Sequence, residues 1–498
     1  MFRLLQNSAK AAVIAVLLSL MMWPAIYNGQ PIFNTDTTSY IRGADAGIAK
    51  LTGHDSVWGA KGRIAAADLE QAPPSLFHPQ KPDFVMAGRS IYYGALLYIG
   101  DALGYLWPTI VVQATAVLLS LGLTLYHIGS FSWRSLALVG VGLAALSPLP
   151  FFVSELSPDL FAGVAILAMA NFIAFGEQMR RAAWCVWLML LSAALSFHTS
   201  HALIAVAMLC FALTVGLLQK KPVRNSAITA LVLALALAAG ADFAFMQGVK
   251  RVLGVMPTRP PFLMARLIAD GPGAAYLRAN CPRAGFTVCS FVDRLQVGDS
   301  DAFLWSTDPS RGVFVNVDAA TRQALSDEQL RFALATLAFD PIGEIKAAAK
   351  NVLHQLGMIG LTHFTYVGDT RFYRARVPSP YIETMERTKA WSGNLPVTSL
   401  PAAALVVASM IFILASATFR RNQISSGVSL FTIAVILGVL FNAAVCGAIS
   451  EPYNRYQARV IWLIPLAALL LAYRRSAKDE PANLASAPFV AGNVGASV

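Results

Sequence analysis

Charged residues are scarce in this sequence. Only 13% of its 498 residues are Asp, Glu, Lys or Arg, whereas 56% are hydrophobic and the mean hydropathy is +0.57. An ordinary soluble domain carries about 25% charged residues. So little charge cannot cover the water-facing surface of a long chain, which excludes a soluble enzyme, a disordered scaffold and a disulfide-rich secreted module. We therefore expect an all-α integral membrane protein.

Cysteine is scarce as well, with five residues in the chain. Cys185, Cys210 and Cys446 fall inside apolar runs, where a small buried apolar residue is the simplest interpretation. Cys281 and Cys289 lie in a long segment outside those runs. In an oxidising compartment they have only each other as partners, so we predict a disulfide between them. With no histidine nearby they would make a poor zinc site.

Apolar runs are abundant, and ten of them approach the length that crosses a bilayer as a helix, about 17–25 residues. They are 11–28, 108–128, 135–153, 159–176, 183–198, 201–219, 226–246, 400–418, 425–447 and 458–473. The first lacks a small-x-small cleavage site, so we interpret it as an uncleaved anchor. The segment 91–107 is weakened by Asp101 and three glycines, and we expect it to lie at the membrane interface.

The distribution of basic residues orients these ten spans. With a cytoplasmic N-terminus, thirteen basic residues fall on cytoplasmic segments and two, Arg455 and Arg459, on short outer turns. The thirteen are Arg3, Lys10, Arg134, Arg180, Arg181, Lys220, Lys221, Arg224, Arg420, Arg421, Arg474, Arg475 and Lys478. This bias predicts a multi-pass protein of the cell (inner) membrane with both termini in the cytoplasm. Topology thus accounts for most of the net charge of +11, and we expect no nucleic-acid partner.

The spans divide the chain into four parts. They are an N-terminal membrane module of seven spans, 1–246, which includes a first outer loop, 29–107; a large extracytoplasmic loop domain, 247–399; three C-terminal spans, 400–473; and a disordered cytoplasmic tail, 474–498. Long loops tend to carry function. We therefore expect the functional site on the extracytoplasmic face.

Asp36 closely follows the first span and is expected near the boundary between membrane and water. Two compatible interpretations are open. Asp36, Thr37 or Thr38 can cap a helix that runs through Tyr40, Ile41 and Ala44. Alternatively, the carboxylate of Asp36 acts as a general base on an acceptor hydroxyl, at the depth where a lipid-linked substrate presents its phosphate.

Further polar residues gather at the predicted outer ends of other spans. Arg89 begins a tyrosine-rich segment. Its tyrosines are typical anchors at the headgroup level, whereas Arg89 can pair with a phosphate. Glu155 and Asp159 share a short turn that has no basic residue, although Asp159 also favours the dipole of the helix that follows. His198 and His201 occupy another turn. They are either ordinary interfacial residues or part of a metal or substrate site.

Arg455 and Arg459 are four residues apart and would share one face of a helix. The positive-inside tendency opposes basic residues in an outer turn, so a specific use is favoured over snorkelling alone. An anionic phosphate is the natural partner of an arginine.

Together these residues resemble the membrane glycosyltransferases of the C superfamily (GT-C), which take sugars from polyprenyl-phosphate donors. Three features carry the resemblance: Asp36 followed by Tyr40; Gly88-Arg89-Ser-Ile-Tyr-Tyr before an amphipathic helix that reaches Trp107; and Arg455-Tyr456 with Pro465 downstream in the final span. The likeness covers residues 1 to about 219 and 440–473, and leaves 247–399 unaccounted for.

The resemblance implies about ten transmembrane helices in a GT-C-like fold, and transfer of a sugar from polyprenyl phosphate to a cell-envelope glycan or glycolipid. It implies Asp36 as the catalytic base and the following substrate-binding residues: Tyr40, Arg42, Arg89, Glu155, Asp159, His198, His201, Arg455, Tyr456 and Arg459. Many members carry a tight Asp-x-Asp pattern, but here Asn34 stands two residues before Asp36. This departure favours a single base without a metal, and we expect no cofactor.

Two segments outside the spans have an amphipathic pattern, 91–107 and 339–356. We expect both to form interfacial helices that flank a prenyl chain.

Two other classes of protein compete with a glycosyltransferase. A transporter or flippase of a lipid-linked or anionic substrate is the alternative function, but it would need ionisable residues near the middle of the membrane. A structural subunit of an envelope complex would explain the large loop but not the two outward arginines.

Overall fold

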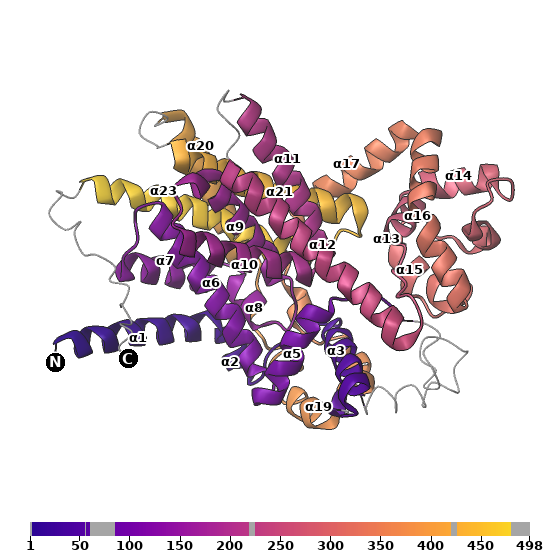
Figure 1. The fold of residues 1–498 in the computed structure, drawn as a ribbon, viewed down its shortest axis with the longest axis horizontal. Helices are drawn as coiled ribbons and strands as arrows, with labels where there is room; N and C mark the ends of the chain where they lie inside the picture. The colour runs from indigo at the N-terminus through magenta and orange to yellow at the C-terminus, as the bar shows by residue number, and fades with distance from the viewer. Residues whose placement is uncertain (1, 55, 60–84, 219–224, 420–425, 480–498) are drawn as a thin grey trace, which may run out of the picture.

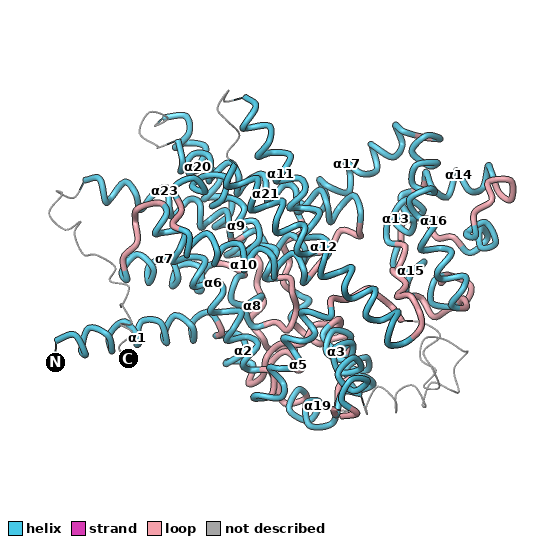
Figure 2. Tube along the Cα trace, in the orientation of Figure 1, coloured by secondary structure: helices cyan, strands magenta, loops and turns pink. Residues whose placement is uncertain are grey.

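The computed structural model describes residues 2–54, 56–59, 85–218, 225–419 and 426–479. These residues fold into helices joined by loops, and the described part of the chain contains no strand, only two isolated β-bridges (Figure 2). The expectation of an all-helical protein with apolar, membrane-compatible helices is therefore met.

Seven helices in the described residues are long and apolar enough to cross a membrane, and each coincides with a predicted span. They are α6 (Trp107–His127), α9 (Leu160–Phe175) with the short η2 (Gly176–Gln178), α11 (Thr199–Leu218), α12 (Asn225–Leu253), α20 (Leu400–Phe419), α21 (Ser426–Ile449), and the nearly continuous pair α22 (Asn454–Ile461) and α23 (Leu463–Asp479). Helix α9 is buried along its whole length, at the centre of the bundle.

The other three predicted spans coincide with shorter apolar helices. These are α1 (Phe2–Met21) with α2 (Trp23–Asn28), α7 (Trp133–Leu146) with α8 (Leu149–Ser154), and α10 (Arg181–Phe197). Proline explains two of the interruptions, because Pro24 stands in the first turn of α2, and Pro148 and Pro150 stand at the start of α8. The count of ten spans therefore stays a prediction.

The first predicted outer loop contains two helices that pack against each other, α3 (Thr37–Thr52) and α5 (Ile91–Gly104). A Cβ atom at Gly94 would lie 2.3 Å from the carbonyl oxygen of Tyr40, so this close approach requires glycine. With 14 residues α5 is too short to span, in keeping with its expected interfacial position. Residues 60–84 of this loop lie outside the described residues.

Residues 247–399 contribute to two hydrophobic clusters. The first cluster is formed by α13 (Phe262–Asp270), α14 (Pro272–Asn280), η3 (Thr287–Arg294), α15 (Ser300–Trp305), η4 (Phe314–Asn316) and α16 (Ala319–Phe339). In Figure 1 these helices stand on the side of the molecule opposite α1 and α23. Cys281 and Cys289 form the predicted disulfide beside this cluster, with an S–S distance of 2.04 Å.

The remainder of 247–399 packs onto the span bundle. The expected amphipathic helix is α17 (Pro341–Gly357), capped by Asp340, whose Oδ1 accepts a hydrogen bond from the Gly343 N–H at 2.8 Å. It packs against α21. After it, η5 (Thr362–Phe364), α18 (Thr370–Arg376) and α19 (Ser379–Met385) add side chains to the main hydrophobic cluster of the bundle.

The C-terminal end differs from expectation at its boundary. We predicted a disordered tail over 474–498, whereas α23 continues to Asp479. Residues 480–498 of that tail lie outside the described residues.

Candidate functional site

Two segments far apart in sequence run side by side and form the floor of the site. The Ile32 N–H donates to the carbonyl oxygen of Ser154 at 2.9 Å, and the Leu156 N–H donates to the carbonyl oxygen of Ile32 at 2.8 Å. The Thr37 hydroxyl also donates to the carbonyl oxygen of Leu156, at 2.9 Å. This pairing joins the chain after α2 to the turn after α8, and so places Asn34 beside Glu155.

Asp36 lies between two arginines from different parts of the chain. Its Oδ1 is 2.5 Å from Nη2 of Arg89, just before α5, and its Oδ2 is 3.2 Å from Nη2 of Arg455, on α22. Asp36 is also the N-cap residue of α3, but its side chain makes no capping hydrogen bond. Of the two interpretations of Asp36, side-chain capping is therefore wrong.

Asn34 connects this ion-pair cluster to Glu155. Its Oδ1 accepts hydrogen bonds from Nη1 of Arg455 at 3.0 Å and from the Asp36 backbone N–H at 2.9 Å. Its Nδ2 donates to Oε1 of Glu155 at 3.0 Å. The amide thus presents its acceptor to the arginine and its donor to the carboxyl group. An aspartate at position 34 would lack that donor.

A second ion pair is buried behind the first. Nη1 of Arg459 lies 2.6 Å from Oδ1 of Asp159, and the side chains are 0% and 4% exposed. The remaining nitrogens of Arg459 donate to Oδ1 of Asn442, at 3.0 and 3.3 Å, and to the Ser200 hydroxyl at 3.1 Å. This pair joins the start of α9 to α21 and α22, and Arg455 approaches it, with Nε 3.9 Å from Oδ2 of Asp159.

The surroundings shift the pKa values of two carboxyl groups in opposite directions. Burial by itself raises the pKa of Asp36, but the charges and hydrogen bonds of Arg89 and Arg455 outweigh it and lower the pKa from 3.8 to about 2. Burial, reinforced by the negative charge of Asp159, raises the pKa of Glu155 from 4.5 to about 8. Asp36 is therefore ionised at neutral pH, whereas the surroundings of Glu155 favour its protonated form.

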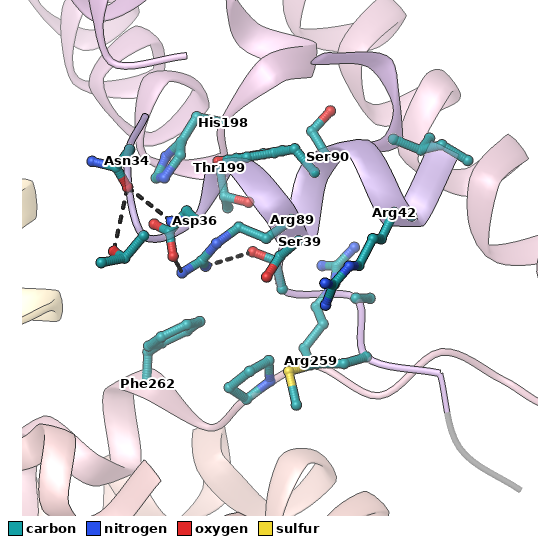
Figure 3. A pocket seen from close by; sticks show the side chains of 18 of the residues that line it. Asn34, Asp36, Ser39, Arg42, Arg89, Ser90, His198, Thr199, Arg259 and Phe262 are labelled. Carbon is teal, nitrogen blue, oxygen red and sulfur yellow. Dashed lines mark hydrogen bonds and ion pairs between the residues drawn. The ribbon is translucent and has the colours of Figure 1, made fainter. Parts of the chain in front are cut away.

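The Asp36 cluster opens onto a cavity of about 3540 Å³. Figure 3 shows Asp36 facing Arg89, with His198 on the same side and Phe262 and Arg259 on the opposite wall. The predicted site residues that line this cavity are Asp36, Tyr40, Arg42, Arg89, His198, Arg455 and Tyr456. The predicted residues Glu155, Asp159, His201 and Arg459 are 0–3% exposed and are not among the residues that line the cavity.

The wall of this cavity combines several parts of the fold. Arg42 donates through Nη2 to the carbonyl oxygen of Arg376, so α3 is joined to α18. On another side, apolar residues of α12 line the cavity, among them Leu235, Phe245 and Val252. The cavity therefore has both a polar wall that carries charge and an apolar wall formed by a candidate membrane span.

Among the described residues, no three His, Cys, Asp or Glu side chains lie close enough together to hold a metal ion. The two histidines that suggested a metal site lie with their ring centroids 5.3 Å apart. His198 Nδ1 is 2.8 Å from the Ser200 hydroxyl, and His201 Nδ1 is 2.7 Å from the carbonyl oxygen of Ala194.

Sequence reasoning missed the contribution of residues 358–399 to this site. The Tyr366 hydroxyl accepts a hydrogen bond from the Phe33 N–H at 2.8 Å, which fixes the loop that carries Asp36. His363 lines the cavity itself. His363 and Tyr366 lie three residues apart in this segment, but no spacing in the sequence connects them to Asp36.

Comparison with family models, with curated proteins and with solved structures gave no match for this chain.

Proposed function

We propose that this chain is a membrane glycosyltransferase that moves a sugar from a polyprenyl-phosphate donor to an acceptor on the extracytoplasmic face. One observation carries the proposal. A carboxylate, Asp36, lies between Arg89 and Arg455 at the wall of a large cavity that is also lined by a candidate membrane span. A base next to two cations, beside an apolar wall, suits a substrate that joins a hydroxyl, a phosphate and a lipid chain.

The reaction assigns a separate task to each of these groups. Asp36 accepts the proton of the acceptor hydroxyl, whose oxygen forms a bond to the anomeric carbon of the sugar. The bond from that carbon to the phosphate oxygen breaks, and its electron pair leaves with the polyprenyl phosphate. Arg89 and Arg455 stabilise the negative charge that develops on this leaving group, as positioned cations do in many transferases.

The geometry also couples donor binding to the basicity of Asp36. The guanidinium groups that would bind the donor phosphate are the same ones that lower the pKa of Asp36 to about 2. A bound phosphate would share their positive charge, and the pKa of Asp36 would rise. The carboxylate would then become a better base only when the donor is in place.

Helix α12 provides a place for the lipid. Its apolar side chains line the cavity, and only 22% of its membrane-spanning window is buried inside the protein. A prenyl chain could therefore enter from the bilayer along α12 while its phosphate reaches Arg455. Ligand pockets are typically lined by apolar side chains together with a few placed polar groups, and this cavity has both.

The test is transfer of radiolabelled sugar from polyprenyl-phosphate donors by purified protein in proteoliposomes. We expect Asp36→Asn to lose about 10²-fold or more of the activity, because the amide cannot accept the proton. The matched control is Glu386→Gln, which removes a carboxylate that is also paired with an arginine, at 2.7 Å from Arg374, but that does not line the cavity. This control should keep wild-type activity.

Two outcomes would contradict the proposal. Full transfer by Asp36→Asn would remove the base from the mechanism. Movement of the lipid-linked sugar across the bilayer without a new glycosidic bond would favour the alternative, a transporter or flippase.

A further inference from the structure

The segment that follows α17 passes along the cavity beside Arg455. The Gly360 N–H donates to Oδ1 of Asn454 at 3.0 Å, and Leu361 and Phe364 are buried in the main hydrophobic cluster. Because Asn454 directly precedes Arg455, this hydrogen bond holds the segment next to the arginine of the candidate site.

His363, within this segment, lines the cavity with both ring nitrogens buried. The centroid of its ring lies 4.0 Å from that of Phe364 and 5.8 Å from that of Phe152, so the imidazole is held between aromatic neighbours. Neither Nδ1 nor Nε2 has a hydrogen-bond partner among the residues that the structure describes. Buried polar atoms are nearly always hydrogen-bonded, so a group with two such atoms in a cavity wall points to a ligand.

The other two histidines near the site differ from His363. His198 uses Nδ1 toward the Ser200 hydroxyl, and His201 uses Nδ1 toward the carbonyl oxygen of Ala194. Each of them has one nitrogen occupied by the protein. In His363, neither nitrogen is hydrogen-bonded to the described residues.

The chemistry of a neutral imidazole selects the kind of group it binds. Burial lowers the pKa of His363 to about 3, so the ring is neutral at physiological pH, with one N–H donor and one acceptor nitrogen. A phosphate oxygen can only accept from such a ring. Sugar hydroxyls both donate and accept, and can therefore use both nitrogens.

We propose that His363 binds hydroxyl groups of the sugar on the lipid-linked donor, while Arg455 binds the adjacent phosphate. This inference rests on the proposed function and adds a residue that determines donor specificity. A sugar attached to a phosphate at Arg455 would project its hydroxyls into the part of the cavity that His363 lines.

The experiment compares binding of polyprenyl monophosphate with binding of the same lipid carrying a hexose or a pentose, for protein in lipid nanodiscs. Wild-type protein should bind at least one glycosylated lipid more tightly than the bare one. His363→Phe keeps an aromatic ring but removes both nitrogens, and should lose about 10-fold of affinity for that glycosylated lipid only. His363→Gln restores a donor and an acceptor and should keep part of the preference.

The control is His54→Phe, at an exposed histidine that follows α3 and does not line the cavity, which should leave both affinities unchanged. Equal loss of affinity for the bare and the glycosylated lipid in His363→Phe would overturn the inference, as would no preference for any glycosylated lipid in wild-type protein. Arg455→Gln separates the two proposals. If wild-type protein binds bare polyprenyl phosphate and Arg455→Gln does not, the phosphate site stands even where the role of His363 fails.

Discussion

Two carboxylate–arginine clusters lie close together in this protein and differ in what can reach them. Asp36 is 20% exposed and Arg455 17%, and both line the cavity. Asp159 and Arg459 are 4% and 0% exposed and lie behind its wall. Arg455 and Arg459 come from the same helix, α22, and both guanidinium groups lie near the ring of Tyr456, at 5.1 and 5.2 Å from its centroid.

The clusters differ in how accessible they are and in how many of their hydrogen bonds are already made within the protein. Arg459 is surrounded by Asp159, Asn442 and Ser200, so a ligand would have to displace bonds within the bundle. Buried pairs of this kind hold elements in register, and breaking one leaves an uncompensated charge. Asp36 and Arg455 instead face a cavity in which an anion can exchange places with the carboxylate. Two clusters of similar composition thus suit different tasks, one structural and one chemical.

The largest expected effect comes from breaking the buried cluster. Asp159→Asn leaves the charge of Arg459 unpaired in the bundle, and we expect a loss of about 3–5 kcal/mol in the free energy of unfolding. Thermal unfolding of the variant in lipid nanodiscs measures it. The matched control is Glu386→Gln, which removes the carboxylate of an exposed pair with Arg374 and should cost less than about 1 kcal/mol.

A stable Asp159→Asn variant that has lost donor binding would overturn this comparison. It would mean that Asp159 acts on the ligand and that the wall between the two clusters opens in the membrane.

A second prediction uses the same substitution at both arginines of α22. Arg455→Lys keeps the charge but loses the planar fork, so we expect the KM for the donor to rise about 10-fold with little change in unfolding temperature. Arg459→Lys should lower the unfolding temperature and leave the KM for the donor nearly unchanged. Lysine cannot hydrogen-bond to Asp159, Asn442 and Ser200 at the same time. Steady-state kinetics and thermal unfolding of the two variants give the comparison. Similar behaviour of the two variants in both assays would refute the division of roles.

Sequence reasoning assigned Asp36, Arg89 and Arg455 to one candidate site on the outer face, and in the structure both arginines form ion pairs with Asp36. Polar residues at the ends of apolar helices share one level of a bundle, so distance along the chain matters little. Sequence reasoning did not assign different roles to Arg455 and Arg459, because a spacing of four residues indicates only a shared helix face. Which arginine lies against Asp159 depends on how α22 packs against α9 and α21, and no local pattern encodes that packing.

The fold shows the same division between local and non-local information. Apolar runs predicted the seven long helices, and Pro24 and Pro148 explain why two predicted spans are divided. The path of 358–399 back onto the bundle was not predictable. It depends on contacts such as Tyr366 with Phe33, which join residues 333 positions apart. His363 reaches the cavity by that path, and so was missed.

Glu155 lies between the two clusters and carries the smallest and most specific prediction. Asn34 links it to Arg455, and the charge of Asp159, after burial, raises its pKa to about 8. In the unfolded chain the carboxyl group has its ordinary value of 4.5. Between about pH 4.5 and pH 8 the unfolded state therefore releases a proton that the folded state retains, so wild-type stability falls as pH rises through this window.

Glu155→Gln removes that titration while keeping the shape of the side chain and an oxygen that can accept from Asn34. We therefore expect the stability of the variant relative to wild type to increase, by the order of 1 kcal/mol or more, between pH 5 and pH 8, and to be constant below pH 4.5. Unfolding temperatures across this range measure the difference. A difference that is flat with pH would mean that Glu155 is ionised in the folded protein. Because Asp159 and Asp36 both repel that charge, Arg455 would then have to neutralise Glu155 as well as Asp36, and the separation between the chemical and the structural cluster would no longer hold.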